Sequence, residues 1–168
     1  MRIFLIGFMG YGKSTNGKKL ATKLGYDFID LDHQVEKVAG TSIAAYFSAN
    51  GETAFRQLES DTLKTMDYPL NSVIATGGGT PCYFDNMEWM NANGTTIYIE
   101  MTALALAKRL ESGKEKRPLI RDYDEQQLVT FIEGKLEERE LFYIQAAITV
   151  QGINLTPDDL RAAILMNK

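Results

Sequence analysis

Residues 7–14, GFMGYGKS, constrain the fold more than any other segment, because they match the phosphate-binding pattern G-x-x-x-x-G-K-[ST]. An apolar run at residues 2–6 precedes them and a helical pattern at 14–24 follows, which is the strand–loop–helix context that the pattern requires. Glycines let backbone N–H groups surround a phosphate, and the helix N-terminus adds its positive dipole end. We expect Lys13 to reach the β- and γ-phosphates and Ser14 to bind Mg²⁺. The segment predicts nucleoside triphosphate binding but does not identify the phosphate acceptor.

Strand-like and helix-like segments alternate along the 168 residues, which predicts an α/β fold with a parallel sheet covered on both faces by helices. The length predicts one domain over residues 1–168. Thr156 and Pro157 form a strong helix start, with a threonine cap before a proline. The expected strands are residues 2–6, 26–30, 72–75, 95–99 and 147–150. The expected helices are residues 14–24, 43–47, 52–65, 103–110 and 125–142, and one that begins at Pro157.

Composition argues against several classes of protein. The 22 acidic and 18 basic residues give a net charge of -4, which is unlike a general nucleic-acid binder. No apolar run approaches the roughly 20 residues that span a bilayer. The single cysteine, Cys82, excludes an internal disulfide and suits a reducing compartment. We therefore predict a cytoplasmic protein with no nucleic-acid or membrane partner. We expect His33 at the surface, Cys82 as a structural thiol and Trp89 packed in a helix.

Two carboxylates, Asp30 and Asp32, follow the second expected strand. Ligands of parallel α/β sheets bind beyond the carboxyl ends of the strands. Because side chains alternate along a strand, we expect Asp30 and Asp32 at its end to point to the same side. There they would hold Mg²⁺ and orient an acceptor hydroxyl. The alternative is a strand-end acid and a helix cap.

Arg56 and Glu59 lie three residues apart and share one face of an expected helix. The pair is either a surface ion pair or an arginine that Glu59 aims at a substrate carboxylate. Three glycines, residues 77–79, follow the third expected strand. They permit close approach of the backbone to a ligand, whereas the alternative is a simple loop.

Residues 112–123 are polar, basic and interrupted by Gly113 and Pro118, which predicts a mobile loop. Because this segment has little apolar surface to bury, we expect it to be the least ordered part of the free protein. Its basic side chains are Lys114, Lys116, Arg117 and Arg121. They form either a solvated face or a positive patch for a polyanion, and the acidic balance of the chain favours the patch.

Five motifs follow the phosphate loop in an order that resembles the shikimate kinases, and the match covers residues 3–147. They are Asp30-x-Asp32, Gly51-Glu52-x-x-Phe55-Arg56-x-x-Glu59, Ala75-Thr76-Gly77-Gly78-Gly79, Arg117-Pro118-Leu119 and Arg139-x-x-x-Tyr143. The resemblance implies a three-layer P-loop NTPase fold with a five-stranded parallel sheet and a lid at about residues 112–124. It implies a monomer that uses ATP and Mg²⁺ to phosphorylate the 3-hydroxyl of shikimate, a step of aromatic amino acid biosynthesis.

The resemblance also implies a role for each residue of the site. Asp32 would bond the acceptor hydroxyl, Arg56 and Arg139 would clamp the shikimate carboxylate, and Arg109 would stack on adenine unless it is only a solvated helix residue. The implied catalytic residues are Lys13, Asp32 and Arg117. The implied ATP-binding residues are Gly10, Tyr11, Gly12, Lys13, Ser14, Thr15, Arg109 and Arg117. The implied shikimate-binding residues are Asp32, Arg56, Gly78, Gly79 and Arg139. The implied metal site is Ser14 with Asp30, the latter through water.

Three other functions compete with this one. Gluconate kinase, or another small-molecule kinase of the same fold, also needs a phosphate loop and an acidic strand end, but not the paired arginines. A GTP-hydrolysing switch should carry the base-reading sequence Asn-Lys-x-Asp, which does not occur in the chain. An inactive relative that acts as a binding module should have lost the chemical groups that this sequence retains.

Overall fold

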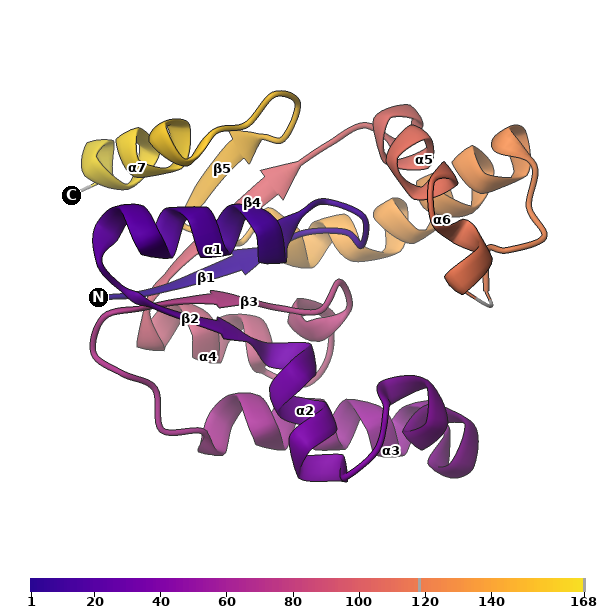
Figure 1. Cartoon of the computed structure of the whole chain (residues 1–168), viewed down its shortest axis with the longest axis horizontal. Helices are drawn as coiled ribbons and strands as arrows, with labels where there is room; N and C mark the ends of the chain where they lie inside the picture. Colours follow the sequence, from indigo (N-terminus) through magenta and orange to yellow (C-terminus); the bar gives the residue numbers. More distant parts are fainter. Residues whose placement is uncertain (118, 168) are drawn as a thin grey trace.

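The computed structural model describes residues 1–117 and 119–167 and contains one five-stranded parallel sheet (Figure 1). The spatial order of its strands is β2-β3-β1-β4-β5. The strands are β1 (Arg2–Ile6), β2 (Asp27–Asp30), β3 (Ser72–Ala75), β4 (Thr95–Glu100) and β5 (Ile148–Gln151). Their order reverses direction beside β1, and in such sheets this switch point is where ligands bind.

Helices cover both faces of the sheet, so the molecule has three layers and the expected α/β class is confirmed (Figure 1). In Figure 1, α1 and α7 lie on one side of the sheet and α3 and α4 on the other. The helices are α1 (Lys13–Leu24), α2 (Leu31–Ala39), α3 (Ile43–Thr65), α4 (Asn86–Asn93), α5 (Ala103–Glu111), α6 (Glu125–Tyr143) and α7 (Pro157–Met166). Two short 3₁₀ turns are η1 (Thr80–Cys82) and η2 (Lys114–Lys116). No helix in residues 1–117 and 119–167 has the length and apolarity needed to cross a membrane.

Strand β1 shows how the sequence builds the core. Ile3 and Leu5 are fully buried in one apolar cluster, while Phe4 and Ile6 are fully buried in a second cluster on the other face. Successive side chains of a strand point to opposite faces, so a central strand needs a continuous apolar run. Trp89 packs beside the second cluster with Met87 and Met90, as expected.

Capping residues and a glycine set the start of α7 and the kink of α3. Thr156 caps α7, Pro157 is its first residue, and Asp159 completes a reciprocal capping box. The two expected helices at 43–47 and 52–65 form the single helix α3, which is kinked at Gly51. Gly51 has φ 85° and ψ 173°, a conformation that other residues rarely adopt.

The interpretation of Asp30 and Asp32 as neighbours on one strand face was wrong. Strand β2 ends at Asp30, whose side chain accepts a hydrogen bond from the His33 backbone N–H and caps α2. Asp32 lies in the first turn of that helix. The helix begins immediately after Asp30 because the strand-end aspartate satisfies one of its free N–H groups. The two carboxylates nevertheless line one cavity, because the end of β2 and the first turn of α2 both border it.

Candidate active site

The phosphate loop joins β1 to α1 and carries three glycines with positive φ, the first of which is Gly7 at 144°. Gly10 has φ 82° and Gly12 has φ 71°. A Cβ at Gly10 would lie 2.7 Å from Leu110 Cδ2, so a side chain there would also collide with α5. Gly12 precedes α1 and provides no side-chain cap, and the first turn of α1 contains no acidic residue. The helix therefore presents its N–H groups and positive dipole end to the loop.

Lys13 is buried beneath this loop. Its Nζ donates hydrogen bonds to the carbonyl oxygens of Gly7, at 2.7 Å, and Phe8, at 2.8 Å. Burial lowers the pKa of Lys13 to about 8, against the opposing influence of Asp32. An ammonium group with only carbonyl partners gains much from an approaching phosphate, because the phosphate supplies the missing negative charge.

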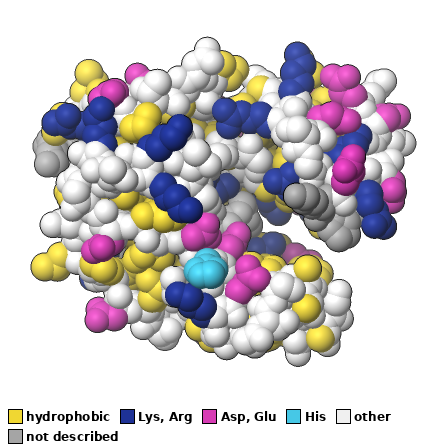
Figure 2. All heavy atoms as spheres, viewed as in Figure 1, with side chains coloured by type: hydrophobic (Ala, Val, Ile, Leu, Met, Phe, Trp, Pro, Cys, Tyr) yellow, Lys and Arg dark blue, Asp and Glu magenta, His cyan; other side chains and the backbone are white. Residues whose placement is uncertain are grey.

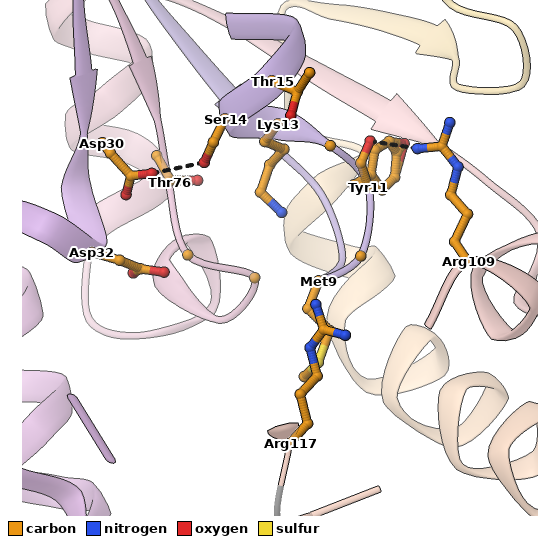
Figure 3. Close-up of a pocket in the computed structure, with 14 residues that line it drawn as sticks. Met9, Tyr11, Lys13, Ser14, Thr15, Asp30, Asp32, Thr76, Arg109 and Arg117 are labelled. Atoms are coloured by element: carbon orange, nitrogen blue, oxygen red, sulfur yellow. Dashed lines mark hydrogen bonds between the residues drawn. The ribbon is translucent and has the colours of Figure 1, made fainter. Parts of the chain in front are cut away.

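The loop opens into a cavity of about 440 Å³ at the carboxyl ends of the strands (Figure 3). All the predicted ATP-site and metal-site residues line it, together with Met9, Thr76 and Gly77. The predicted residues that line it are Gly10, Tyr11, Gly12, Lys13, Ser14, Thr15, Asp30, Asp32, Gly78, Arg109 and Arg117. Figure 2 shows the surface hollowed between the lobe that contains α2 and α3 and the lobe that contains α5.

Arg109 and Arg117 reach this cavity from the same part of the chain but in different ways (Figure 3). Arg109 extends from α5 and its Nη1 donates a 3.0 Å hydrogen bond to the Tyr11 carbonyl. The Tyr11 ring is buried, and its hydroxyl donates to the Ile99 carbonyl at the end of β4. Arg117 follows η2 and points toward Met9. The cavity therefore has one arginine beside the loop backbone and one above it.

The cavity that Lys13 lines also contains side-chain oxygens that could bind a metal ion. The Ser14 hydroxyl donates a 2.7 Å hydrogen bond to Asp30 Oδ2, and Asp32 lines the same cavity. Within residues 1–117 and 119–167, no three His, Cys, Asp or Glu side chains gather in a metal-binding group. Mg²⁺ keeps several waters and often takes one or two protein oxygens together with substrate phosphates. The Ser14–Asp30 pair therefore fits Mg²⁺ and offers too few ligands for a metal that needs a full protein cage.

A second cavity of about 200 Å³ adjoins the first, and Met9, Asp32, Gly77 and Gly78 line both. Arg56 and Arg139 are far apart in the sequence, but both line the second cavity and neither lines the first. The other residues that line it are Ile43, Phe55, Glu59 and Gly79. The phosphate-loop cavity and the arginine-rich cavity therefore meet at Asp32.

The Arg56–Glu59 pair forms, but it is not the surface ion pair that was one of its two interpretations. Arg56 Nη1 donates to Glu59 Oε1 at 2.9 Å, and the two side chains are only 12% and 1% exposed. Thr80 Oγ1 donates to the other Glu59 oxygen at 2.8 Å. A buried carboxylate with two partners holds the guanidinium in place, because leaving either charge unpaired in the interior is costly.

Each glycine of the Gly77–Gly79 run lies against at least one charged side chain, and Gly77 lies against both Asp32 and Glu59. A Cβ at Gly77 would be 2.9 Å from Asp32 Oδ1, and one at Gly79 would be 2.6 Å from both Arg56 Nη atoms. A Cβ at Gly78 would be 3.2 Å from Arg139 Nη1. The sequence predicted close approach of this backbone to a ligand, whereas the structure shows close approach to the protein's own side chains.

Asp32 has an unusual protonation equilibrium. Its pKa is raised to about 6, mainly by burial and also by the negative charges of Glu59 and Asp30, while Lys13 acts in the opposite direction. A carboxylate of this pKa is mostly ionised at neutral pH yet accepts a proton more readily than an ordinary aspartate. Its position between the two cavities and its basicity together make it a candidate general base.

The segment at residues 112–124 differs from the expectation of a loop with little to bury. Ile120 is only 1% exposed and belongs to the first core cluster. Lys114 Nζ donates to the Tyr123 carbonyl at 3.0 Å, and Asp124 caps α6. Ile120, together with the partly buried Tyr123, therefore anchors the segment to the core, which composition did not reveal. Pro118, which was expected to interrupt the segment together with Gly113, lies outside the described residues.

Sequence reasoning assigned no role to Met9 or Tyr143. Met9 lines both cavities, and its position between Gly7 and Gly10 was the available signal. Tyr143 is fully buried and donates a 2.5 Å hydrogen bond to the Gly78 carbonyl. The i, i+4 spacing of Arg139 and Tyr143 places both on one face of α6.

Two residues with a surface or structural interpretation behave as expected. His33 is exposed, and the histidine is visible at the surface in Figure 2. Cys82 is half-buried in η1, and burial raises the pKa of its thiol to about 11. A thiol with a raised pKa carries little thiolate at neutral pH and is a poor nucleophile.

A family model, curated relatives and solved structures of shikimate kinases all resemble this chain. The family model for shikimate kinase matches residues 9–166. A shikimate kinase of Parabacteroides distasonis is 45% identical over 88% of this chain and 86% of its own length. The crystal structure of shikimate kinase from Bacteroides thetaiotaomicron has a TM-score of 0.85 and 39% identity, covering 99% of this chain and 93% of that one. That of Acinetobacter baumannii, in complex with shikimate, has a TM-score of 0.85 and 30% identity, covering 99% and 94%. The chain belongs to the shikimate kinase family.

Proposed function

We propose that this chain transfers the γ-phosphoryl group of ATP to the 3-hydroxyl of shikimate. The observation that carries the proposal is the position of Asp32, which lines both the phosphate-loop cavity and the arginine-rich cavity. A kinase must hold its donor and its acceptor on either side of one reacting oxygen. The family membership supports the choice of shikimate as that acceptor.

On the donor side, the phosphate loop and Lys13 bind the phosphates. The triphosphate replaces the Gly7 and Phe8 carbonyls as the partner of Lys13 Nζ. The Ser14 hydroxyl and the Asp30 carboxylate would hold Mg²⁺, Asp30 through water, and the ion would neutralise phosphate charge. Arg109 lies beside Tyr11, where the base of the nucleotide extends from the loop. These contacts position the donor and stabilise the charge of the transferring group.

On the acceptor side, Arg56 and Arg139 bind the carboxylate of shikimate. Two guanidinium groups in one small cavity suit a planar carboxylate, which accepts paired hydrogen bonds from each fork. The Gly78–Gly79 backbone forms the floor beneath the ring. This arrangement fixes the distance from the carboxylate end of the acceptor to Asp32.

Asp32 accepts a hydrogen bond from the 3-hydroxyl and takes its proton as the oxygen attacks. Its pKa of about 6 suits this role near neutral pH. Arg117, which lines the donor cavity, places positive charge near the transferring group when the segment at residues 112–124 closes. Ile120 remains buried and acts as the anchor about which the segment moves.

A coupled ADP-release assay tests the proposal directly. Shikimate should support turnover with ATP and Mg²⁺, whereas quinate, gluconate and nucleoside monophosphates should not approach its kcat/KM. The product should carry phosphate on the 3-oxygen by phosphorus and proton NMR. Gluconate as the preferred acceptor would replace this function with the main competing one.

We also propose that the active form is a cytoplasmic monomer. The residues that line both cavities come from one chain, so the proposed site is complete without a second copy. Light scattering during size exclusion tests this, and a stable dimer near 38 kDa, twice the 18.8 kDa chain, would contradict it.

A further inference from the structure

The Arg56 guanidinium has neighbours beyond its ion pair with Glu59. Its Cζ lies 4.3 Å from the centroid of the Tyr83 ring and 5.0 Å from that of Phe55. Its Nε lies 3.8 Å from Glu52 Oε1, and that buried nitrogen has no hydrogen-bond partner among the described residues. Glu59 therefore fixes one nitrogen of the group, while the Tyr83 ring supports one of its flat sides.

Tyr83 holds α3 through two different contacts. It lies just beyond η1, between that turn and α4, whereas Arg56 and Glu52 lie on α3 after the kink at Gly51. The Tyr83 hydroxyl donates a 2.9 Å hydrogen bond to Glu52 Oε1 while the ring stacks on Arg56. The two contacts join the segment that follows the glycine run to the helix that carries the acceptor-binding arginine.

The orientation of the guanidinium plane decides how well Arg56 binds a carboxylate. A single hydrogen bond to Glu59 leaves the group free to rotate about that bond, but a ring stacked on its face restricts the rotation. The Arg56 Cζ lies over the Tyr83 ring, a contact that consumes no N–H donor, so the donors that Glu59 does not use stay available for a carboxylate. The ring is therefore placed to preorganise Arg56 without competing for its hydrogen bonds.

We propose that Tyr83 is a positioning residue that fixes the plane of the Arg56 guanidinium for the carboxylate of the acceptor. The proposal rests on the proposed function, because it takes shikimate as that acceptor. It assigns selectivity for a carboxylate-bearing acceptor to a residue outside the lining of either cavity.

The test is steady-state kinetics of Tyr83→Leu and Tyr83→Phe. A cation–ring contact of about 0.5–2 kcal/mol corresponds to a roughly 2- to 30-fold rise in the KM for shikimate. We expect this rise in Tyr83→Leu, with the KM for ATP and kcat within about twofold of wild type. Tyr83→Phe keeps the ring and loses only the hydrogen bond to Glu52, so it should restore most of the affinity. Tyr83→Met carries the same prediction if Tyr83→Leu does not fold.

Shikimamide, the carboxamide of shikimate, separates positioning from general damage. It lacks the negative charge that Arg56 recognises, so Tyr83→Leu and wild type should have the same KM for it. Phe84→Leu is the matched control, because it removes the neighbouring ring, which is 57% exposed and does not line the acceptor cavity. That control should leave the KM for shikimate unchanged.

Three results would overturn the inference: an unchanged KM for shikimate in Tyr83→Leu, an equal rise for ATP and shikimate, or an equal rise for shikimate and shikimamide. Failure of the proposed function is distinguishable from these. A wild-type chain that does not phosphorylate shikimate refutes both, whereas an active wild type with any of the three results refutes the role of Tyr83 alone.

Discussion

Replacing Asp32 by asparagine should make the free protein more stable while making it a much poorer catalyst. Asparagine has nearly the same shape but no charge, and Asp32 is a largely buried carboxylate with Glu59 and Asp30 nearby. The wild-type protein must ionise this group in an unfavourable place at neutral pH. The variant has no carboxylate to ionise. The substitution therefore separates the effect of the buried charge on stability from its effect on catalysis.

The magnitude follows from the pKa of Asp32, which rises from 3.8 to about 6 on folding. Each pKa unit corresponds to about 1.4 kcal/mol, so ionised Asp32 lowers the free energy of unfolding by about 3 kcal/mol. A raised folded pKa means that the protonated group favours the folded state. This advantage is complete below pH 3.8 and is lost as the pH rises through 6. The variant should therefore match wild type near pH 3.5 and exceed it by about 3 kcal/mol above pH 7, or by roughly 6–12 °C in Tm.

Urea unfolding of both proteins between pH 3.5 and pH 8 measures this difference. Asp67→Asn, at an exposed position beyond the end of α3, is the matched control and should change the free energy of unfolding by less than about 0.5 kcal/mol. A difference that does not vary with pH, or a variant less stable than wild type at pH 8, would refute the reasoning. In the same variant, kcat should fall by about 10²- to 10⁴-fold if Asp32 is a general base. A smaller loss would assign it to positioning, since a loose phosphoryl transition state needs little help from a base.

Three further predictions concern the other charged groups of the site. Lys13→Met should abolish transfer and leave the fold intact by circular dichroism, because the ammonium group faces the donor cavity; near-normal turnover in the folded variant would contradict its role. Arg56→Ala and Arg139→Ala should each raise the KM for shikimate about tenfold or more and spare ATP affinity by calorimetry, and lysine should rescue only in part. Unchanged shikimate affinity with a lower Tm would indicate a purely structural ion pair. Arg117→Ala should reduce kcat far more than it raises either KM, and hydrogen exchange at residues 112–124 should slow only when nucleotide and shikimate are both bound. Full activity of Arg117→Ala would contradict the catalytic role of Arg117. Equal protection from hydrogen exchange with and without ligands would contradict closure of the segment.

The parts of the site that the sequence predicted are those set by local chemistry. The phosphate loop could be identified because a strand, a loop with three glycines of positive φ and a helix start follow one another along the chain, and each leaves its own signal. The cap of α7 at Thr156 was predictable for the same reason. The place of Asp32 was not, because the choice between extending β2 and starting α2 depends on a cap that Asp30 provides.

The remaining errors and omissions depend on contacts between distant parts of the chain. The burial of Ile120 requires the first core cluster, which includes residues of β1, α1 and α6, so the composition of its own segment could not reveal it. The stack of Tyr83 on Arg56 joins residues that lie 27 positions apart on separate elements. Such contacts have no periodicity and no turn signal, and they become visible only when the elements are packed.

The close packing of the Gly77–Gly79 run limits how the acceptor specificity of this enzyme can be redesigned. Any side chain introduced at Gly77 or Gly79 would displace Asp32 or the Arg56 guanidinium before it touched an acceptor. Substitution at Gly77 or Gly79 should therefore lower activity by moving the site's own charged groups, rather than change which acceptor the pocket takes. Variation toward new acceptors has to enter from α3 and α6, where Ile43, Phe55 and Arg139 contribute side chains to the wall.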